Sequence, residues 1–166
     1  MTDEDYMRIA LEEAEKAAAI GEVPIGAVVV YEPIDKGTRR PLAEPRVIAC
    51  AHNLRETMKD PAGHAEFLAM KEAARVLDAW RLTDCTVYVT LEPCIMCAGL
   101  MHQSRISRCV YGASDQKAGA AGTLYSVHVD ERLNHQFEVE AGVLQEECVN
   151  LLRSFFESRR KKRSEK

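Results

Sequence analysis

The stretch Pro93-Cys94-Ile95-Met96-Cys97 places two thiols three residues apart, behind a proline and ahead of a run compatible with a helix. Proline is tolerated in the first turn of a helix, because its missing N–H has no partner there. Residues three apart are neighbours on a helix, so Cys94 and Cys97 converge on one point. The positive end of the helix dipole lowers thiol pKa values and favours thiolates. The stretch therefore predicts half of a metal site.

The expected completion of this site is His64-Ala65-Glu66, at the start of a second predicted helix. Asp60-Pro61-Ala62-Gly63 before it is a turn signal, and strong helix formers follow it. The side chains of His64 and Glu66 point about 200° apart around a helix axis. Both can therefore reach one site only if that site lies beyond the end of the helix. One imidazole and two thiolates neutralise Zn²⁺ and leave a fourth position for water, which is typical of catalytic zinc. We predict one Zn²⁺ per subunit on these three ligands, with Glu66 as the group that moves protons.

Length and composition indicate one soluble globular domain. The 166 residues suffice for one sizeable core, and 46% are apolar while 29% are charged. No apolar run approaches the roughly 18 residues of a membrane span, and the acidic N-terminus does not resemble a signal peptide. Irregularly spaced cysteines without secretory features indicate reduced thiols, so we expect a cytoplasmic protein with no membrane partner. Four cysteines are expected to be small buried side chains: Cys50, Cys85, Cys109 and Cys148.

Strands that alternate with helices predict an α/β fold, a three-layer α/β/α sandwich around one sheet. Helices are expected at residues 3–20, 64–76, from residue 94, and over the last apolar run at 144–155. Strands are expected at residues 25–31, 47–52, 86–90, 108–112 and 137–140. Residues 32–46 hold three prolines and are too long for an ordinary hairpin loop, so we interpret them as a solvated insertion.

The charge is distributed unevenly along the chain. A net charge of −4 excludes attraction of the whole molecule to a polyanion. Residues 159–166 differ, because six of them are basic: Arg159, Arg160, Lys161, Lys162, Arg163 and Lys166. Two interpretations of this tail stay open at this point. It is either a frayed terminus that aids solubility, or a contact for phosphates with a salt-dependent affinity.

The motif His64-x-Glu66 with Pro93-Cys94-x-x-Cys97 resembles the H-x-E…P-C-x-x-C signature of zinc-dependent nucleobase deaminases. Over nearly the whole chain, the sequence is also similar to the bacterial tRNA adenosine deaminases. The matching pieces are residues 22–28, 53, 60–66, 88–94, 96–99, 115–122, 134–135, 155–156 and 159–160. The Gly-Ala-Ala-Gly loop at 119–122 and the Phe-Phe…Arg-Arg ending favour the tRNA branch. On this resemblance, residues 1–158 form a zinc-dependent deaminase domain with an inserted loop at 32–46, and residues 159–166 form a basic C-terminal tail.

The resemblance implies hydrolysis of adenosine to inosine at the wobble position of a tRNA anticodon, with an arginine tRNA as the expected substrate. It also implies a cytidine deaminase-like fold with a central five-stranded mixed sheet, and a homodimer that binds the anticodon stem-loop. Glu66 would move protons to the purine N1 and to the leaving amine, and Asn53 would hydrogen-bond the base. The Ala65 and Pro93 backbones would line the pocket, and Asp115 would meet the RNA. A loop nucleotide suits this site, because extruding it avoids the cost of opening a duplex.

Two alternatives compete with this interpretation. A free nucleobase or nucleoside deaminase of the guanine or cytidine type has the same fold and zinc site, but the basic tail and the 119–122 loop argue against it. A zinc-stabilised RNA-binding module without turnover is disfavoured by Glu66 and by only three protein ligands. The chain departs from the tRNA branch twice. Residues 32–46 exceed the family's usual hairpin, and Ala62-Gly63 replaces Thr-Ala, which removes a hydroxyl that could cap the helix.

Overall fold

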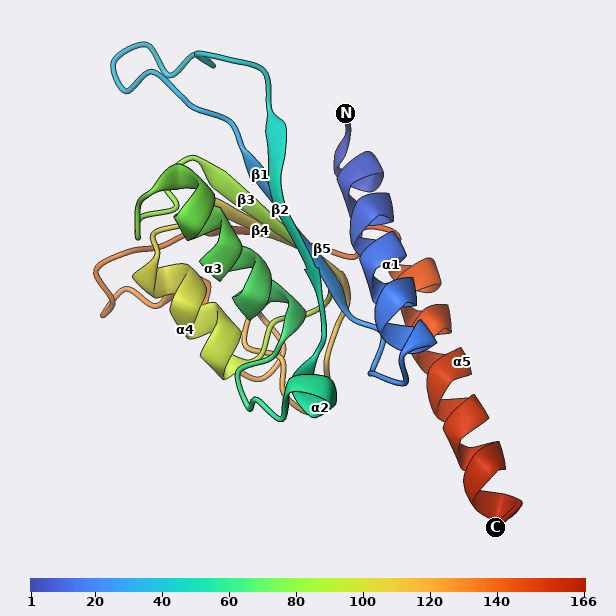
Figure 1. The fold of residues 1–166 in the computed structure, drawn as a ribbon. Coiled ribbons are helices and arrows are strands. Elements are labelled where there is room, and N and C mark those ends of the chain that lie inside the picture. The colour runs from blue at the N-terminus through green and yellow to red at the C-terminus, as the bar shows by residue number, and fades with distance from the viewer.

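Five strands form one mixed sheet at the centre of the computed structural model, which describes residues 1–166 (Figure 1). The strands lie in the order β2-β1-β3-β4-β5. Their bounds are Gly26–Tyr31 for β1, Arg46–His52 for β2, Cys85–Leu91 for β3, Arg108–Ala113 for β4 and Glu138–Ala141 for β5. β1 runs antiparallel to both neighbours, while β3, β4 and β5 are parallel to one another. The predicted five-stranded mixed sheet is confirmed.

Helices cover both faces of the sheet, which confirms the predicted three-layer sandwich (Figure 1). α1 (Asp3–Ala19) and α5 (Gln145–Ser164) lie on one face, and α3 (Ala65–Leu77) and α4 (Ile95–Gln103) lie on the other. Because both faces are covered, β1 is an unbroken apolar run in which residues 27–30 are all buried. An apolar core forms on each side of the sheet. No helix combines the length and the apolar character needed to cross a membrane.

The strand directions bring two helix starts together. β2 and β3 both run opposite to β1, so their carboxyl ends meet at the same edge of the sheet. From that edge the chain leaves β2 toward His64 and leaves β3 toward Cys94. α4 then serves as the crossover that the parallel pairing of β3 and β4 requires. The first turns of α3 and α4 therefore face a common point.

The inserted segment lies at the opposite end of the sheet (Figure 1). It leaves β1 at Tyr31, which pairs with Cys85 at the beginning of β3, whereas Cys94 follows the end of β3. The segment is held by hydrogen bonds within it and to the residue that precedes β3. The Ile34 amide donates to Asp84 Oδ2 at 3.2 Å, and the Leu42 amide donates to the carbonyl of residue 33 at 2.8 Å. This placement separates the insertion from the helix starts that face each other.

Several details differ from expectation. The sequence patterns do not predict α2 (Arg55–Met58) or the short 3₁₀ helix η1 (Val127–Val129), since each is about one turn long. α5 continues to Ser164, so the boundary placed after residue 158 falls inside a helix, consistent with the helix propensity of Arg and Lys. Cys50 was expected to be buried, and this is wrong. It is exposed because β2 is an edge strand with a partner on one side only, whereas the other three cysteines of that group are buried.

Asp3 ties the start of α1 to the sheet. Its Oδ1 accepts hydrogen bonds from the Tyr88 hydroxyl and from Nη1 of Arg108, and its Oδ2 accepts from Nη2 of Arg108, all at 2.8 Å. The hydrogen bond from Arg108 is the main reason why the pKa of Asp3 is lower than its usual value. A carboxyl group whose pKa is lower in the folded state stabilises the fold above its unfolded pKa, and this contribution is lost as the pH falls.

We expect Asp3→Asn to lower the free energy of unfolding at neutral pH by about 1–2 kcal/mol, because the pair is partly exposed and bidentate. The difference between the variant and the wild type should shrink as the pH falls through the lowered pKa of Asp3, because the wild-type carboxylate is then protonated as well. Urea unfolding at neutral pH and in acid measures this. Glu72→Gln, which breaks the exposed pair with Arg75, serves as a control that changes little. An equal loss at both pH values would contradict the ion-pair explanation.

Candidate active site

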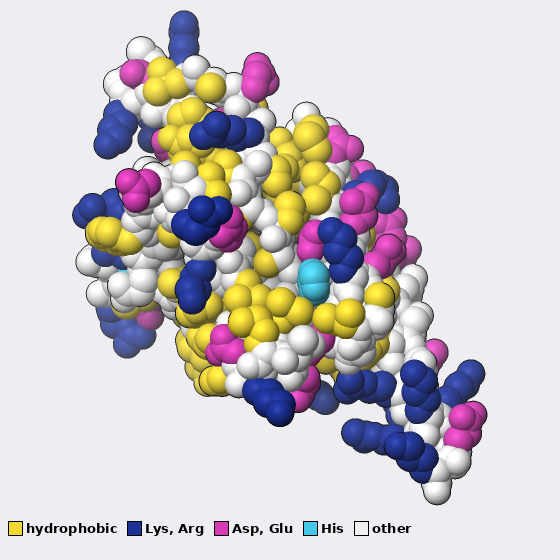
Figure 2. All heavy atoms as spheres, in the orientation of Figure 1, with side chains coloured by type: hydrophobic (Ala, Val, Ile, Leu, Met, Phe, Trp, Pro, Cys, Tyr) yellow, Lys and Arg dark blue, Asp and Glu magenta, His cyan; other side chains and the backbone are white.

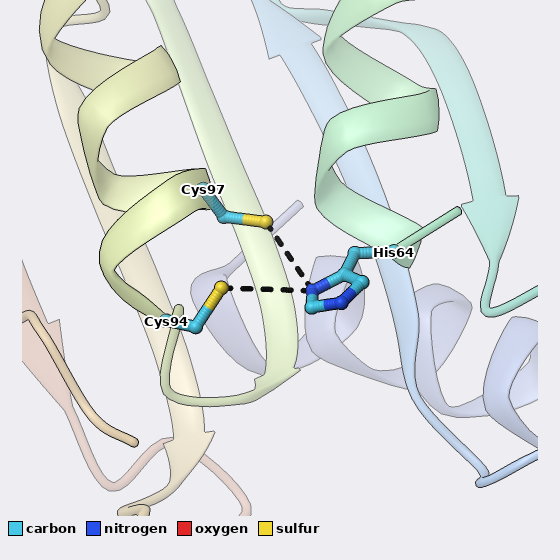
Figure 3. A group of neighbouring side chains, drawn as sticks. All are labelled: His64, Cys94 and Cys97. Carbon is cyan, nitrogen blue, oxygen red and sulfur yellow. Dashed lines mark hydrogen bonds between the residues drawn. The ribbon is translucent and has the colours of Figure 1, made fainter. Parts of the chain in front are cut away.

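Three side chains with metal-binding atoms meet between the starts of α3 and α4 (Figure 3). His64 is the N-cap residue of α3, Cys94 is the N-cap residue of α4, and Cys97 lies in the first turn of α4. The Nδ1 atom of His64 is 3.6 Å from the Sγ atom of each cysteine. All three potential ligand atoms lie within 4.8 Å of one another. The structure thus brings together the three residues that the sequence predicts as metal ligands.

The spacing of these atoms fits a tetrahedral zinc ion. Zinc lies about 2.3 Å from a thiolate sulfur and about 2.0–2.1 Å from an imidazole nitrogen, so tetrahedral angles place N and S about 3.6 Å apart. The two distances from His64 Nδ1 have this value. Soft thiolates together with one imidazole are a typical zinc ligand set. The donor atoms therefore suit zinc in both chemistry and geometry.

The charges of the cluster also favour a cation. The pKa of Cys94 is lowered to about 4, chiefly by the hydrogen bond from Cys97 and also by the one from His64. The pKa of Cys97 is raised, first by its hydrogen bond to Cys94 and then by burial. The hydrogen bond with Cys94 raises the pKa of His64. Two sulfurs this close share one negative charge, and the charge of a divalent cation would allow both to ionise.

Glu66 lies beside the cluster in the first turn of α3, with only 4% of its surface exposed. Burial raises its pKa to about 7, since a carboxylate loses hydration energy in a closed site. Its carboxyl group also hydrogen-bonds Cys97. A carboxyl group with a pKa near neutrality can both accept and donate a proton under physiological conditions. Glu66 therefore has the position and the proton affinity of a general acid–base group.

A small cavity opens next to His64. It has a volume of about 100 Å³ and is lined by Val23, Ile25, Asn53, Arg55 and His64. The amide of Asn53 is held in place, because its Nδ2 donates to the Val23 carbonyl at 3.2 Å and its Oδ1 accepts from the Arg55 amide at 3.1 Å. The structure thus places Asn53 beside the cluster, and its contact with a base stays a prediction.

The other predicted substrate contacts occupy different surroundings. Ala65 is fully buried at the start of α3, and contact of its backbone with the substrate stays a prediction. The Pro93 carbonyl accepts a hydrogen bond from the Ala120 amide at 2.9 Å. Asp115 Oδ1 accepts from the amides of residues 117 and 118 at 2.9 and 3.2 Å, so this carboxylate organises its own loop. Pro93 and Asp115 do not line the cavity beside His64, and their roles also stay predictions.

Sequence reasoning missed one prominent residue near the site. Glu92 directly precedes Pro93, has 2% of its surface exposed, and hydrogen-bonds the loop that begins at Asp115. In the sequence, Glu92 lies in the stretch 88–94 that matches the family, but no role was predicted for it. A signal was present, because a glutamate at the end of an apolar strand must find partners if it is buried. The residues of the cavity wall, Val23, Ile25 and Arg55, gave no comparable signal.

Comparisons with known proteins agree with this geometry. A family model described as MafB19-like deaminase matches residues 1–160. The tRNA-specific adenosine deaminase of Bacillus subtilis is 49% identical over 161 residues, which cover 97% of this chain and 92% of that protein. The protein of the same name from Haemophilus influenzae is 44% identical, with coverages of 97% and 87%.

Solved structures show the same relationship. A structure from a study of A-to-I editing by tRNA:A34 deaminases at the wobble position matches with a TM-score of 0.76 and 35% identity. It covers 89% of this chain and 98% of its own. The guanine deaminase of Bacillus subtilis matches with a TM-score of 0.58 and 32% identity, over 74% and 71% of the two chains. By its full-length similarity, the chain belongs to the MafB19-like deaminases and to the tRNA-specific adenosine deaminase family.

Proposed function

We propose that this protein converts adenosine to inosine at the wobble position of a tRNA anticodon, in a zinc-dependent hydrolysis that releases ammonia. The observation that carries the proposal is the cluster of His64, Cys94 and Cys97 with the buried Glu66 beside it. The relatives named above support the substrate class, because they are named for the same reaction on tRNA. An arginine tRNA is the species that the family resemblance favours.

In this proposal His64, Cys94 and Cys97 would hold the zinc ion, which would supply Lewis-acid activation of a water molecule. Glu66 would accept one proton of the water as the water oxygen bonds to C6 of the purine, and would deliver that proton to N1. The same carboxyl group would then take the second proton of the water and give it to the amine, whose bond to C6 breaks. Adenosine and water are consumed, and inosine and ammonia are formed.

The recessed position of the site supports an extruded nucleotide as the substrate. Glu66 and Cys97 are both buried, and the cavity beside His64 measures about 100 Å³. A base can reach them only after it leaves its stack. In a duplex this step costs a few kcal/mol, whereas a nucleotide of an anticodon loop is already unpaired. We propose that Asn53, whose amide is held in the wall of the cavity, hydrogen-bonds the entering base.

The end of α5 supports contact with the RNA backbone. Figure 2 shows Lys and Arg side chains gathered around the C-terminal end of this helix. Arg159 stacks on Phe155, 4.7 Å from the ring centroid, and donates to the Gly21 carbonyl at 2.5 Å, so it anchors the helix. Arg160 and Arg163 line the adjacent groove without an ion-pair partner. We propose that they contact phosphates, which makes the affinity for RNA fall as the salt concentration rises.

The test of the proposed function is a competition between substrate classes. The protein would be given a short anticodon hairpin together with free adenosine, guanine and cytidine, and inosine, xanthine and uridine would be quantified. We expect conversion of the hairpin and none of the free compounds. The likeness to a guanine deaminase makes guanine the informative rival. Turnover of guanine with an untouched hairpin would contradict the proposal and favour the free-base alternative.

We also propose a homodimer, and a cytoplasmic location because tRNA acts there in translation. An exposed apolar groove of about 500 Å³ begins at Ile95, the residue after Cys94, and continues along Tyr125, Val129 and Leu133. Ile95, Tyr125 and Val129 are each more than half exposed. Large exposed apolar groups of this kind mark protein interfaces. Its position next to a zinc ligand supports a second copy of this chain as the occupant, since both subunits could then border the RNA site.

We expect Val129→Glu to convert the dimer to a monomer, because a charge in an apolar interface loses its hydration. Sedimentation analysis measures the mass directly. Leu42→Glu is the matched control. Leu42 is also exposed and apolar, but it lies in the inserted segment at the other end of the sheet, so this variant should remain a dimer. A single-chain mass for the wild type, or an unchanged dimer in Val129→Glu, would contradict the assignment of this groove.

A further inference from the structure

We propose that Glu92 is a positioning residue that holds the loop of residues 115–123 against the metal-binding turn, and thereby sets the affinity for the RNA substrate. The inference rests on the proposed function, because the loop matters for affinity only if it borders the substrate. It assigns a role to a buried side chain that takes no part in the chemistry of Glu66.

Glu92 collects hydrogen bonds from both ends of the loop. Its Oε1 accepts from the Asp115 amide at 3.1 Å and from the Thr123 hydroxyl. Its Oε2 accepts from the Ala121 amide and from the Thr123 amide, each at 3.1 Å. The Glu92 amide in turn donates to the Ala113 carbonyl at 2.8 Å, which aligns the residue with the end of β4. One side chain therefore accepts from three backbone N–H groups, those of residues 115, 121 and 123, which span the whole loop.

The surroundings of Glu92 suit a carboxylate in particular. Four donors converge on its two oxygens, and an ionised carboxylate is the one side-chain group of this size that only accepts at both ends. Hydrogen bonds to an ionised acceptor are about twice as strong as neutral ones. Only 2% of the residue is exposed, so water cannot replace a lost partner without a local opening.

Gly119 shows how closely the loop surrounds this carboxylate. A Cβ atom at this position would overlap the Glu92 carboxyl group and would approach the Asp115 carbonyl to 2.6 Å. The next residue, Ala120, donates its amide to the Pro93 carbonyl at 2.9 Å. The loop is thus joined to two consecutive residues, Glu92 and Pro93, that directly precede the metal-binding Cys94.

The position of the loop explains why affinity is the property at stake. It begins at Asp115, and the amide of its Ala120 donates to the Pro93 carbonyl, so it borders the turn that leads into Cys94 and the proposed zinc site. If the hydrogen bonds to Glu92 are lost, the loop can open locally while the sheet and the helices stay folded. The metal ligands and Glu66 are held by α3 and α4 rather than by this loop, so they keep their positions. The expected consequence is a higher KM with a nearly unchanged kcat.

Glu92→Gln tests this role because it should remove the hydrogen-bond acceptor of some loop amides and leave that of others in place. If the new NH₂ replaces Oε2, it faces the amides of both Ala121 and Thr123. If it replaces Oε1, it faces only the Asp115 amide, because the Thr123 hydroxyl can rotate and accept instead. The second orientation leaves fewer groups unpaired and is therefore favoured. The Asp115 amide should lose its protection from hydrogen exchange, while those of Ala121 and Thr123 keep theirs.

The experiment compares wild type, Glu92→Gln and the control Glu13→Gln in the zinc-loaded protein. Glu13 is a second buried glutamate, bonded to Lys16 and His52 rather than to this loop. In Glu92→Gln we expect amide exchange at Asp115 to accelerate about tenfold or more and KM for the hairpin to rise about tenfold, the effect of one lost charged hydrogen bond. Changes in kcat should stay within about threefold, with zinc content unchanged. Glu13→Gln should alter none of these quantities.

Two results for Glu92→Gln would overturn the proposal. Unchanged exchange at Asp115 would show that Glu92 does not hold the loop, and loss of zinc or of kcat with KM intact would assign it to the chemistry instead. If Glu92→Gln does not fold, Thr123→Val removes only the hydroxyl donor, and an unchanged KM in that variant overturns the proposal equally. A wild-type protein that ignores the hairpin would refute the proposed function, while the exchange measurement still decides whether Glu92 holds the loop.

Discussion

Glu66→Gln is expected to lower the rate of deamination by a factor of about 10³ or more, because general acid–base catalysis contributes about 10²–10⁴ and this group acts in successive proton transfers. Glutamine has nearly the same shape and cannot accept and release a proton at neutral pH. Because Glu66 has only 4% of its surface exposed, an isosteric change avoids the cavity that alanine would leave. Single-turnover inosine formation, measured with the zinc content, separates chemistry from metal loss.

Glu13→Gln provides the control for that prediction. It makes the same chemical change at another buried glutamate, one that bonds Lys16 and His52 away from the cluster. Its rate should equal that of the wild type. A Glu66→Gln rate within about tenfold of the wild type, with zinc retained, would remove Glu66 from the proton-transfer role.

The second large effect is expected for Cys94→Ala, which should lose both the metal and the activity. A three-ligand zinc site that loses a thiolate keeps only His64 and Cys97, and two ligands do not retain zinc in a catalytic geometry. Elemental analysis of the purified protein should give well below one zinc ion per chain, and inosine formation should become undetectable. Addition of zinc should not restore the rate.

Cys50→Ala is the matched control for the metal prediction. Cys50 is an exposed cysteine of the edge strand and belongs to no cluster of metal-binding residues. Its variant should keep the wild-type zinc content and rate. Full zinc occupancy in Cys94→Ala would contradict the ligand assignment, whatever happens to the activity.

The metal cluster could be predicted from the sequence because its geometry is local. Cys94 and Cys97 share one helical turn, and the helix dipole acts on thiols at that turn whatever the rest of the fold does. His64 and Glu66 lie at a helix start, which predicts their end-on approach. The alternation of strands and helices likewise predicted the layered sheet, because the spacing of apolar residues along each element indicates which of its faces is buried.

The contacts that were missed depend on pairs that are distant in sequence. Glu92 finds its partners 23 to 31 residues away, and no local pattern encodes which backbone amides will meet it. The position of residues 32–46 follows from the order and direction of the strands. They place this connection between β1 and β2 at the end of the sheet opposite to Cys94. Cys50 looked like a core residue because its neighbours are apolar, and only the edge position of β2 exposes it.

The most direct test of the central claim is a map of inosine along one RNA. An anticodon hairpin of an arginine tRNA with adenosines at the wobble position and elsewhere in the loop would be treated with the zinc-loaded protein. Each position would then be read by mass spectrometry of the digested RNA. We expect inosine at the wobble position alone in the wild type, and none with Glu66→Gln. Inosine spread over several loop positions, or absent from the hairpin altogether, would contradict the proposal that this zinc site acts on the wobble adenosine.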